Sequence, residues 1–143
     1  RLLGEACHFV DLIRFLTGFE IISMDIKYAN DMKICSDTFT LSIKFSDGSI
    51  GSVHYFANGN KLVPKERLEV YANGKVFLLD DFKKLKAWGH KSFKERKLRK
   101  QDKGNYNCLK DFVNTIYSGG SSPIPINELI EIHKWLITGQ NNE

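Results

Sequence analysis

The sequence predicts an α+β domain with a largely antiparallel open sheet and helices packed on one face. An amphipathic helical pattern opens the chain, a middle section alternates apolar and polar residues between tight-turn signals, and two amphipathic helical patterns close it. Because strands and helices are segregated along the chain, hairpin-linked antiparallel strands are favoured over a parallel sheet. The 143 residues, 42% hydrophobic and 27% charged, predict one domain over 1–143 with a single core.

The first predicted helix runs from Glu5 to Thr17. Gly18 follows as a C-terminal stop, because glycine readily adopts the left-handed conformation that ends helices. The apolar residues recur at helical spacing: Phe9, Val10, Ile13 and Leu16.

The predicted strands follow a period of two, which places alternate side chains on one buried face. In the first strand these are Ile22, Met24, Ile26 and Tyr28, and in the second Phe39, Leu41, Ile43 and Phe45. Asp47-Gly48 supplies a tight turn into a strand at 50–56, and Asn73-Gly74 joins strands at 67–72 and 75–79. A further strand is predicted at 85–88.

Two helices are predicted near the C-terminus. The first ends at Gly119-Gly120 and has one apolar stripe, made of Leu109, Phe112, Val113, Ile116 and Tyr117. Asn127 is predicted to cap the second, with Glu128 and Glu131 in a first turn that favours acids. Its inward-facing residues are predicted to be Leu129, Ile130, Leu136 and Ile137.

The opening helix carries the candidate chemistry. Glu5, His8 and Asp11 are three residues apart, which places them along one ridge away from the apolar side. A histidine in a first helical turn feels the positive end of the dipole, which favours the neutral imidazole that a general base needs. A carboxylate one turn away can orient the ring and stabilise the imidazolium. On spacing alone, a solvated or structural histidine remains the alternative.

The stretch Arg1-Leu2-Leu3-Gly4-Glu5-Ala6-Cys7-His8-Phe9-Val10-Asp11-Leu12, followed by Phe15-Leu16-Thr17-Gly18, resembles the opening of the C-terminal domain in the glucose-fructose oxidoreductase, inositol dehydrogenase and MocA family. Looser matches are Asp102-Lys103-Gly104-Asn105-Tyr106 and Ser122-Pro123-Ile124-Pro125-Ile126. The resemblance implies the substrate-binding C-terminal half of a Rossmann-type dehydrogenase that transfers hydride between a nicotinamide and a sugar-type hydroxyl, including nucleotide-linked or phosphorylated sugars.

In that family the histidine of H-x-x-D lies beside the substrate hydroxyl, so the resemblance implies that His8 is the acid/base residue and Asp11 its acidic partner. Many members have an Asp four residues before this histidine, where this chain has Gly4. Either Glu5 takes over part of that role from a different helical angle, or the role is absent. Lys103 is a further supporting or substrate-binding candidate. NAD or NADP is implied, bound mainly by an N-terminal Rossmann domain, because this chain has no G-x-G-x-x-G after a strand.

The first residue is Arg1, and the helical pattern begins within ten residues of it, so we expect the chain to be a fragment that is inactive alone. No apolar run approaches the roughly 20 residues that span a bilayer, and no secretion leader is recognisable. Cys7, Cys35 and Cys108 are widely spaced and are expected to be free thiols in the cytoplasm. His54, His90 and His133 lack metal-ligand spacing, so structural or surface roles are expected.

Residues 83–103 contain ten of the 21 Lys and Arg against two acids. With Trp88 and Phe93 interleaved, this run is the basis of the alternative function, a non-enzymatic module that binds nucleic acid or another polyanion. A solvated hairpin, or cations that grip substrate phosphates, are the other readings, and nucleic acid is the less favoured partner.

A polar face of the sheet is also predicted, made of Ser23, Asp25, Lys27, Thr40, Ser42 and Lys44. The family resemblance implies that such sheets pair between subunits, so a homo-oligomer is expected.

Overall fold

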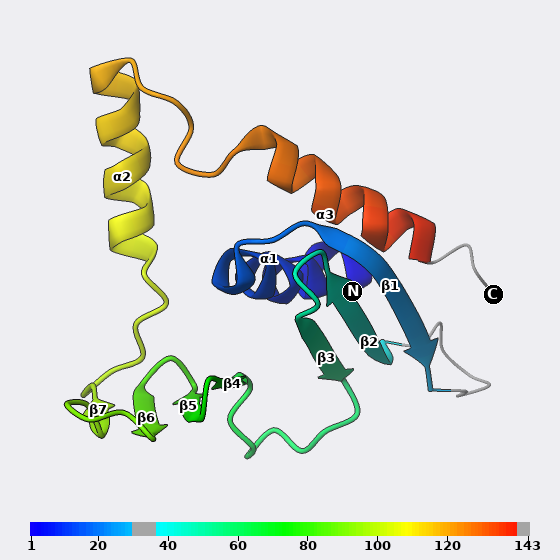
Figure 1. Cartoon of the computed structure of the whole chain (residues 1–143), viewed down its shortest axis with the longest axis vertical. Coiled ribbons are helices and arrows are strands. Elements are labelled where there is room, and N and C mark those ends of the chain that lie inside the picture. Colours follow the sequence, from blue (N-terminus) through cyan, green and yellow to red (C-terminus); the bar gives the residue numbers. More distant parts are fainter. Residues whose placement is uncertain (30–36, 140–143) are drawn as a thin grey trace. The chain divides into compact units, whose positions relative to one another are not determined.

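The computed structural model describes residues 1–29 and 37–139. By contacts between Cα atoms the chain divides into two compact units, Arg1–Asn58 with Ser121–Glu143, and Gly59–Gly120. Within the described residues, two antiparallel sheets and three α-helices confirm the predicted α+β class (Figure 1).

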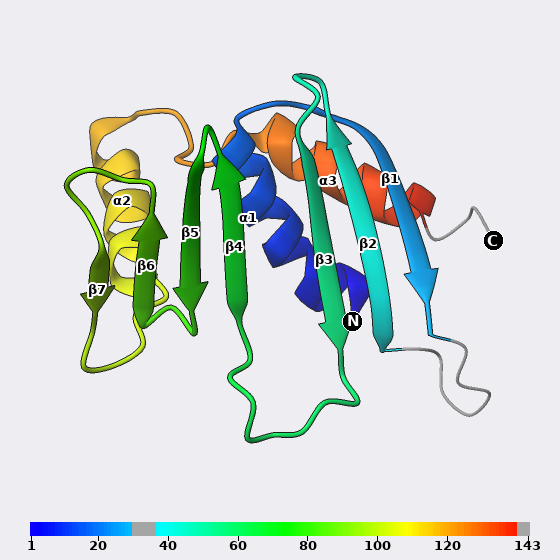
Figure 2. The same cartoon turned by 60° about the horizontal axis from the view of Figure 1, so that its bottom comes forward.

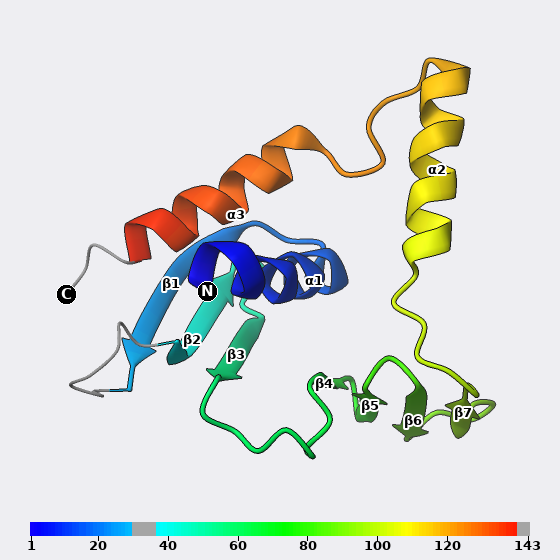
Figure 3. The same cartoon turned by 180° about the vertical axis from the view of Figure 1, so that it is seen from behind.

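The first unit contains a three-stranded sheet with the order β1-β2-β3, and two helices on one of its faces. Figure 2 shows the three strands side by side, and Figure 3 shows α1 and α3 on the same side of them. The elements are the π-helical turn η1 (Leu2–Ala6), α1 (Cys7–Thr17), β1 (Ile21–Tyr28), β2 (Thr38–Phe45), β3 (Ile50–Phe56) and α3 (Ile126–Gly139).

The hydrophobic core of this unit lies between the sheet and the helices. The alternation predicted for β2 is confirmed, because all four of its predicted inward residues are at most 2% exposed. The helices contribute Leu2, Ala6, Val10, Ile132 and Leu136 to the same cluster. Burial of these apolar side chains is the main force that holds α1 and α3 to the sheet.

The first strand departs from strict alternation. Its register with β2 shifts between Ile21 and Ser23, so one extra residue is accommodated there. As a result Ile21 is buried, and Ile22, predicted to face inward, is 49% exposed. The remaining positions of the strand keep the predicted face, with Met24 and Ile26 buried.

The last helix also differs from the prediction. It begins at Ile126, so Asn127 lies inside the first turn and is not the cap. The backbone carbonyl of Pro125 accepts the first helical bonds, from the amides of Glu128 and Leu129. Ile130 and Ile137 were predicted to face inward but are exposed, whereas Ile132 is buried together with the predicted Leu136.

The second unit contains a four-stranded antiparallel sheet with the order β4-β5-β6-β7, followed by one helix. Its elements are β4 (Arg67–Ala72), β5 (Lys75–Asp80), β6 (Lys84–Trp88), β7 (Glu95–Lys97) and α2 (Asn105–Ser118). The predicted Asn73-Gly74 turn is confirmed, with both residues at positive φ. No strand was predicted at the residues of β7, although a solvated hairpin was one reading of the basic run that contains it.

Two further sequence expectations concern thiols and membranes. Cys7 and Cys108 are free thiols, and Cys35 lies outside the described residues. Within residues 1–29 and 37–139, no helix has the length and apolar character needed to cross a membrane.

Candidate functional site

The helix that carries His8 starts earlier than the sequence predicted. The π-helical turn η1 runs directly into α1, and the residues at the junction, Ala6 and Cys7, keep right-handed helical angles. Helical backbone therefore begins at Leu2, so His8 does not lie in the first turn. The predicted influence of the helix N-terminus on His8 is wrong for this reason, because that influence fades within about one turn.

His8 lies on the exposed side of α1, and Asp11, one turn later, is half-buried. The imidazole is therefore open to solvent and is not enclosed by apolar neighbours. Glu5 belongs to the π-helical turn, and its carboxylate forms an exposed ion pair with Arg1 at 3.2 Å. Glu5 thus has a local partner of its own, and its predicted role toward His8 stays a prediction.

A second carboxylate from α3 joins this surface. The pKa of the Asp11 carboxyl is raised, first by its burial and second by the negative charge of Glu128, while the charge of His8 opposes the shift. His8, Asp11 and Glu128 are therefore near enough to interact electrostatically across α1 and α3. From the sequence, Glu128 was predicted only to be a helix-terminus acid, because 117 residues separate it from Asp11 and no local spacing connects them.

A partly buried ion pair fixes α3 against α1, and the same carboxylate binds β1. Arg14 is 7% exposed, and its Nε donates to the Glu131 carboxylate at 3.2 Å. The other oxygen of Glu131 accepts a hydrogen bond of 2.5 Å from the backbone amide of Ile21, the first residue of β1. The Glu131 side chain therefore ties α3 to both α1 and β1.

Lys103, the remaining predicted site residue, lies in the second unit. Its ammonium forms an ion pair with Glu66 and sits 6.0 Å from the centre of the Phe82 ring. Phe82 and Asp81 form the turn between β5 and β6, and both have positive φ, at 47° and 51°. Non-glycine residues are strained in this conformation. The contacts of Lys103 therefore help to hold this strained turn in place. Its substrate-binding role stays a prediction.

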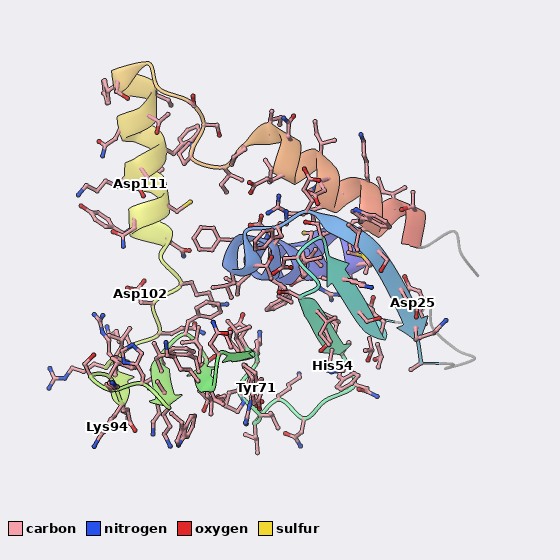
Figure 4. The ribbon with its side chains drawn as sticks, viewed as in Figure 1. Asp25, His54, Tyr71, Lys94, Asp102 and Asp111 are labelled. Carbon is pink, nitrogen blue, oxygen red and sulfur yellow. The ribbon has the colours of Figure 1, made fainter. Side chains whose placement is uncertain are left out.

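The basic run 83–103 forms the hairpin of β6 and β7 and the segment that leads to α2. Lys84 pairs with Glu95 at 3.3 Å, and Lys94 lies near the turn of this hairpin (Figure 4). In this sheet β7 is an edge strand, and lysines on an edge oppose pairing with other strands. Protection of this sheet edge is one structural reason for the positive charge of residues 83–103. Polyanion binding by the run remains a hypothesis.

The other histidines have structural contacts. The His54 ring lies within hydrogen-bonding distance of the Thr40 hydroxyl, 3.0 Å, and Figure 4 shows it on β3. His90 accepts from the Phe93 amide, and His133 lies 2.8 Å from the Leu129 carbonyl. Within residues 1–29 and 37–139, no group of three or more His, Cys, Asp or Glu has the arrangement of a metal site.

The face of the β1-β2-β3 sheet that points away from the helices is polar and solvent-exposed, with Thr40 half-buried. It holds a shallow groove whose walls come from all three strands and which is lined by Ser23, Asp25, Ser42, Lys44, Ile50 and Ser52 among others. The groove lies on the side of the sheet opposite α1, so it is not part of the His8 surface.

No family model matches the chain, and no curated protein matches it by sequence. Solved structures do match. UDP-N-acetylglucosamine 3-dehydrogenase GnnA from Acidithiobacillus ferrooxidans shares 14% sequence identity with a TM-score of 0.82, over 98% of this chain and 46% of its own. The chain has the fold of part of a dehydrogenase.

Two other solved oxidoreductases share this fold. Aldose-aldose oxidoreductase from Caulobacter crescentus, complexed with glycerol, has 16% identity and a TM-score of 0.66 over 93% of this chain and 44% of its own. The WlbA dehydrogenase from Bordetella pertussis, in complex with NADH and UDP-GlcNAcA, has 15% identity and a TM-score of 0.56 over 97% of this chain and 43% of its own.

The chain therefore spans less than half the length of these dehydrogenase-fold relatives, while they cover nearly all of it. This share fits a C-terminal domain, as the sequence resemblance implied. The fold that the resemblance predicted is thus confirmed, and the neighbours are oxidoreductases of sugars or nucleotide sugars. At 14–16% identity the likeness concerns the fold, so the roles of individual residues remain to be argued from the chain itself.

Proposed function

We propose that this chain is the substrate-binding half of an NAD- or NADP-dependent oxidoreductase that acts on a hydroxyl of a sugar or nucleotide sugar. The observation that carries the proposal is an exposed histidine, His8, on the surface of α1 in a fold shared with sugar and nucleotide-sugar oxidoreductases. Half-buried Asp11, one turn away, supplies the acidic partner that a histidine acid/base needs.

The proton chemistry belongs to α1. During oxidation His8 accepts the proton of the substrate hydroxyl, and during reduction it returns that proton. The negative charges of Asp11 and Glu128 stabilise the imidazolium that forms in between. Because Arg14 and Glu131 fix α3 against α1, these charges stay in place and need no rearrangement during the reaction.

The nicotinamide supplies the acceptor or donor of hydride. The residues of this chain include no glycine-rich turn between a strand and a helix, so none of them is assigned to the pyrophosphate of the cofactor. We assign that role to a second half of the full-length protein, and the chain alone is then expected to be inactive.

The proposal is tested with the full-length protein and a panel of UDP-sugars, phosphorylated sugars and free aldoses, each with NAD⁺ and NADP⁺. Formation of reduced nicotinamide with at least one sugar-type substrate is the expected result. A protein that binds neither nicotinamide nor any sugar in the panel would contradict the proposal.

We also propose that the polar face of the β1-β2-β3 sheet pairs with the same face of a second copy. The face offers both charges, with Asp25 and Lys27 on β1 and Lys44 on β2, so two copies can form complementary pairs. Sedimentation of the full-length protein tests this, because Ser42→Arg should shift a dimer toward monomer. A wild-type protein that is monomeric at micromolar concentration would refute it.

A further inference from the structure

The helix α2 exposes its entire apolar side. Within its 14 residues none is buried, and only Thr115 is half-buried. Positions 109, 112, 113 and 116 recur at the spacing of one helical face. We call these four residues the α2 stripe, and their exposed fractions are 64% for Leu109, 54% for Phe112, 38% for Val113 and 63% for Ile116. A contiguous apolar patch of this kind on a soluble protein marks a contact surface.

The chain segment before α2 is anchored to its own sheet, and this fixes where the helix begins. The backbone amide of Leu98 donates to the Lys83 carbonyl at 2.9 Å, and that of Asp102 donates to the Phe82 carbonyl at 3.1 Å. The Gln101 side-chain amide donates to Asp81 at 2.9 Å.

Gly104 then redirects the chain with φ of 76°, and its amide donates to the Asp102 carboxylate at 2.8 Å. Figure 4 shows Asp102 just before the helix and Asp111 along it. These bonds and the Lys103–Glu66 ion pair hold the chain to its sheet as far as Gly104, the residue before the helix. Beyond this anchored segment α2 leaves its own sheet with the stripe exposed.

The comparisons indicate what covers the stripe. A solved dehydrogenase matches 98% of this chain, a range that includes α2, and has more than half of its own length beyond the match. A tethered second half meets the stripe at high effective concentration, an advantage that a separate partner lacks. We infer that the α2 stripe is the surface on which the cofactor-binding half of the full-length oxidoreductase docks, an inference that rests on the proposed function.

Hydrogen–deuterium exchange of the α2 amides, compared between the full-length protein and the 143-residue chain alone, tests the inference. We expect exchange at least about tenfold slower in the full-length protein, because docking suppresses local opening of the helix. In the full-length protein, Leu109→Asp with Ile116→Asp should restore fast exchange. The matched control, Asn107→Asp with Asn114→Asp, adds the same two charges on the opposite side of α2 and should leave exchange slow.

The possible results separate the docking inference from the proposed function. Equal exchange in the two proteins overturns the docking inference, and a sugar oxidoreductase activity measured alongside it would leave the proposed function standing. Slow exchange in a full-length protein that binds neither nicotinamide nor any sugar of the panel shows that a second half covers the stripe, but it refutes the proposed function and overturns the inference that this half binds a cofactor. Protection that appears in the chain alone and grows with its concentration identifies a second copy as the occupant and overturns the inference.

Discussion

Asp11 shows how a half-buried carboxylate costs stability. Burial and the neighbouring Glu128 charge both disfavour its ionised form, so in the folded protein the pKa of the Asp11 carboxyl lies above the ordinary value of 3.8. The folded state then binds more protons at Asp11 than the unfolded state between the two pKa values. Stability from this group is therefore highest below the ordinary value and falls as pH rises through the folded pKa.

Replacing Asp11 by Asn removes that penalty while keeping the shape of the side chain. We predict that Asp11→Asn is more stable than wild type at neutral pH and that the difference shrinks toward acid. Urea unfolding at a series of pH values measures it, with Asp25→Asn on the outer sheet face as the control. A stability difference that is independent of pH would contradict the assignment of a raised pKa.

Single residues near the site were predictable from sequence only when their signal was local. His8 and Asp11 are three residues apart, and their shared ridge could be read from helical spacing. The contribution of Glu128 could not, because it depends on how α3 packs against α1. Nor could the early helix start at Leu2, since a π-helical turn has no distinctive sequence pattern.

At the scale of elements, α1 passes closely over β3. A Cβ atom added to Gly51 would lie 2.8 Å from Cγ2 of Ile13, which is a branch on a stiff β-branched side chain. A Cβ added to Gly139 on α3 would also lie 2.8 Å from an isoleucine, but from Cδ1 of Ile26, the flexible end of that side chain. The side chain next to Gly139 can therefore move aside more easily than the side chain next to Gly51.

We predict that Gly51→Ala destabilises the protein by about 1–3 kcal/mol, because overpacking shifts α1 from the sheet. Gly139→Ala should change stability by less than about 1 kcal/mol, since the isoleucine end can rotate away and alanine favours helix. Chemical denaturation of the two variants measures both values. A Gly51→Ala variant as stable as Gly139→Ala would show that α1 does not approach β3 this closely.

The Arg14–Glu131 ion pair should contribute to the stability with which α3 packs against α1. Glu131→Ala leaves the guanidinium of Arg14 without its partner in a site where only 9% of that side chain is exposed. We expect a loss of about 3 kcal/mol, because the variant leaves the buried Arg14 charge unpaired. Glu95→Ala, which breaks the exposed pair with Lys84, should cost less than about 1 kcal/mol. If thermal or urea unfolding showed that Glu131→Ala and Glu95→Ala lose the same amount of stability, the structural role of Glu131 would be contradicted.

Elements whose boundaries depend on local turn chemistry were predicted well. Asp47-Gly48 and Asn73-Gly74 both lie in turns as expected, because Gly48, Asn73 and Gly74 adopt the positive φ that glycine and asparagine tolerate. The shift in register at Ile21 and the inward position of Ile132 were missed, because they result from pairing and packing between segments distant in sequence.

At the scale of the whole molecule, the two units differ in how much core they contain. Thirteen of the buried hydrophobic residues form the cluster of the first unit, and Ala87 is the one buried hydrophobic residue within the described part of the second. Local stability follows the number of buried apolar contacts. The strands β4–β7 should therefore open more readily than β1–β3.

Hydrogen exchange on the 143-residue chain tests this difference within one sample. We predict that amides of β2, the central strand of the first sheet, exchange the slowest, and that amides of β5 exchange measurably faster although β5 is also central. Equal protection of β2 and β5 would show that the two units unfold as one.

In the proposed function, His8 exchanges the proton of a sugar hydroxyl. The most direct test of this role is the kcat/KM of full-length His8→Ala for the best sugar substrate, beside His54→Ala, which removes an imidazole on the opposite side of the first sheet. We predict a loss of about 100-fold or more for His8→Ala, with unchanged unfolding, and wild-type turnover for His54→Ala. A His8→Ala enzyme that turns over like wild type would contradict the account.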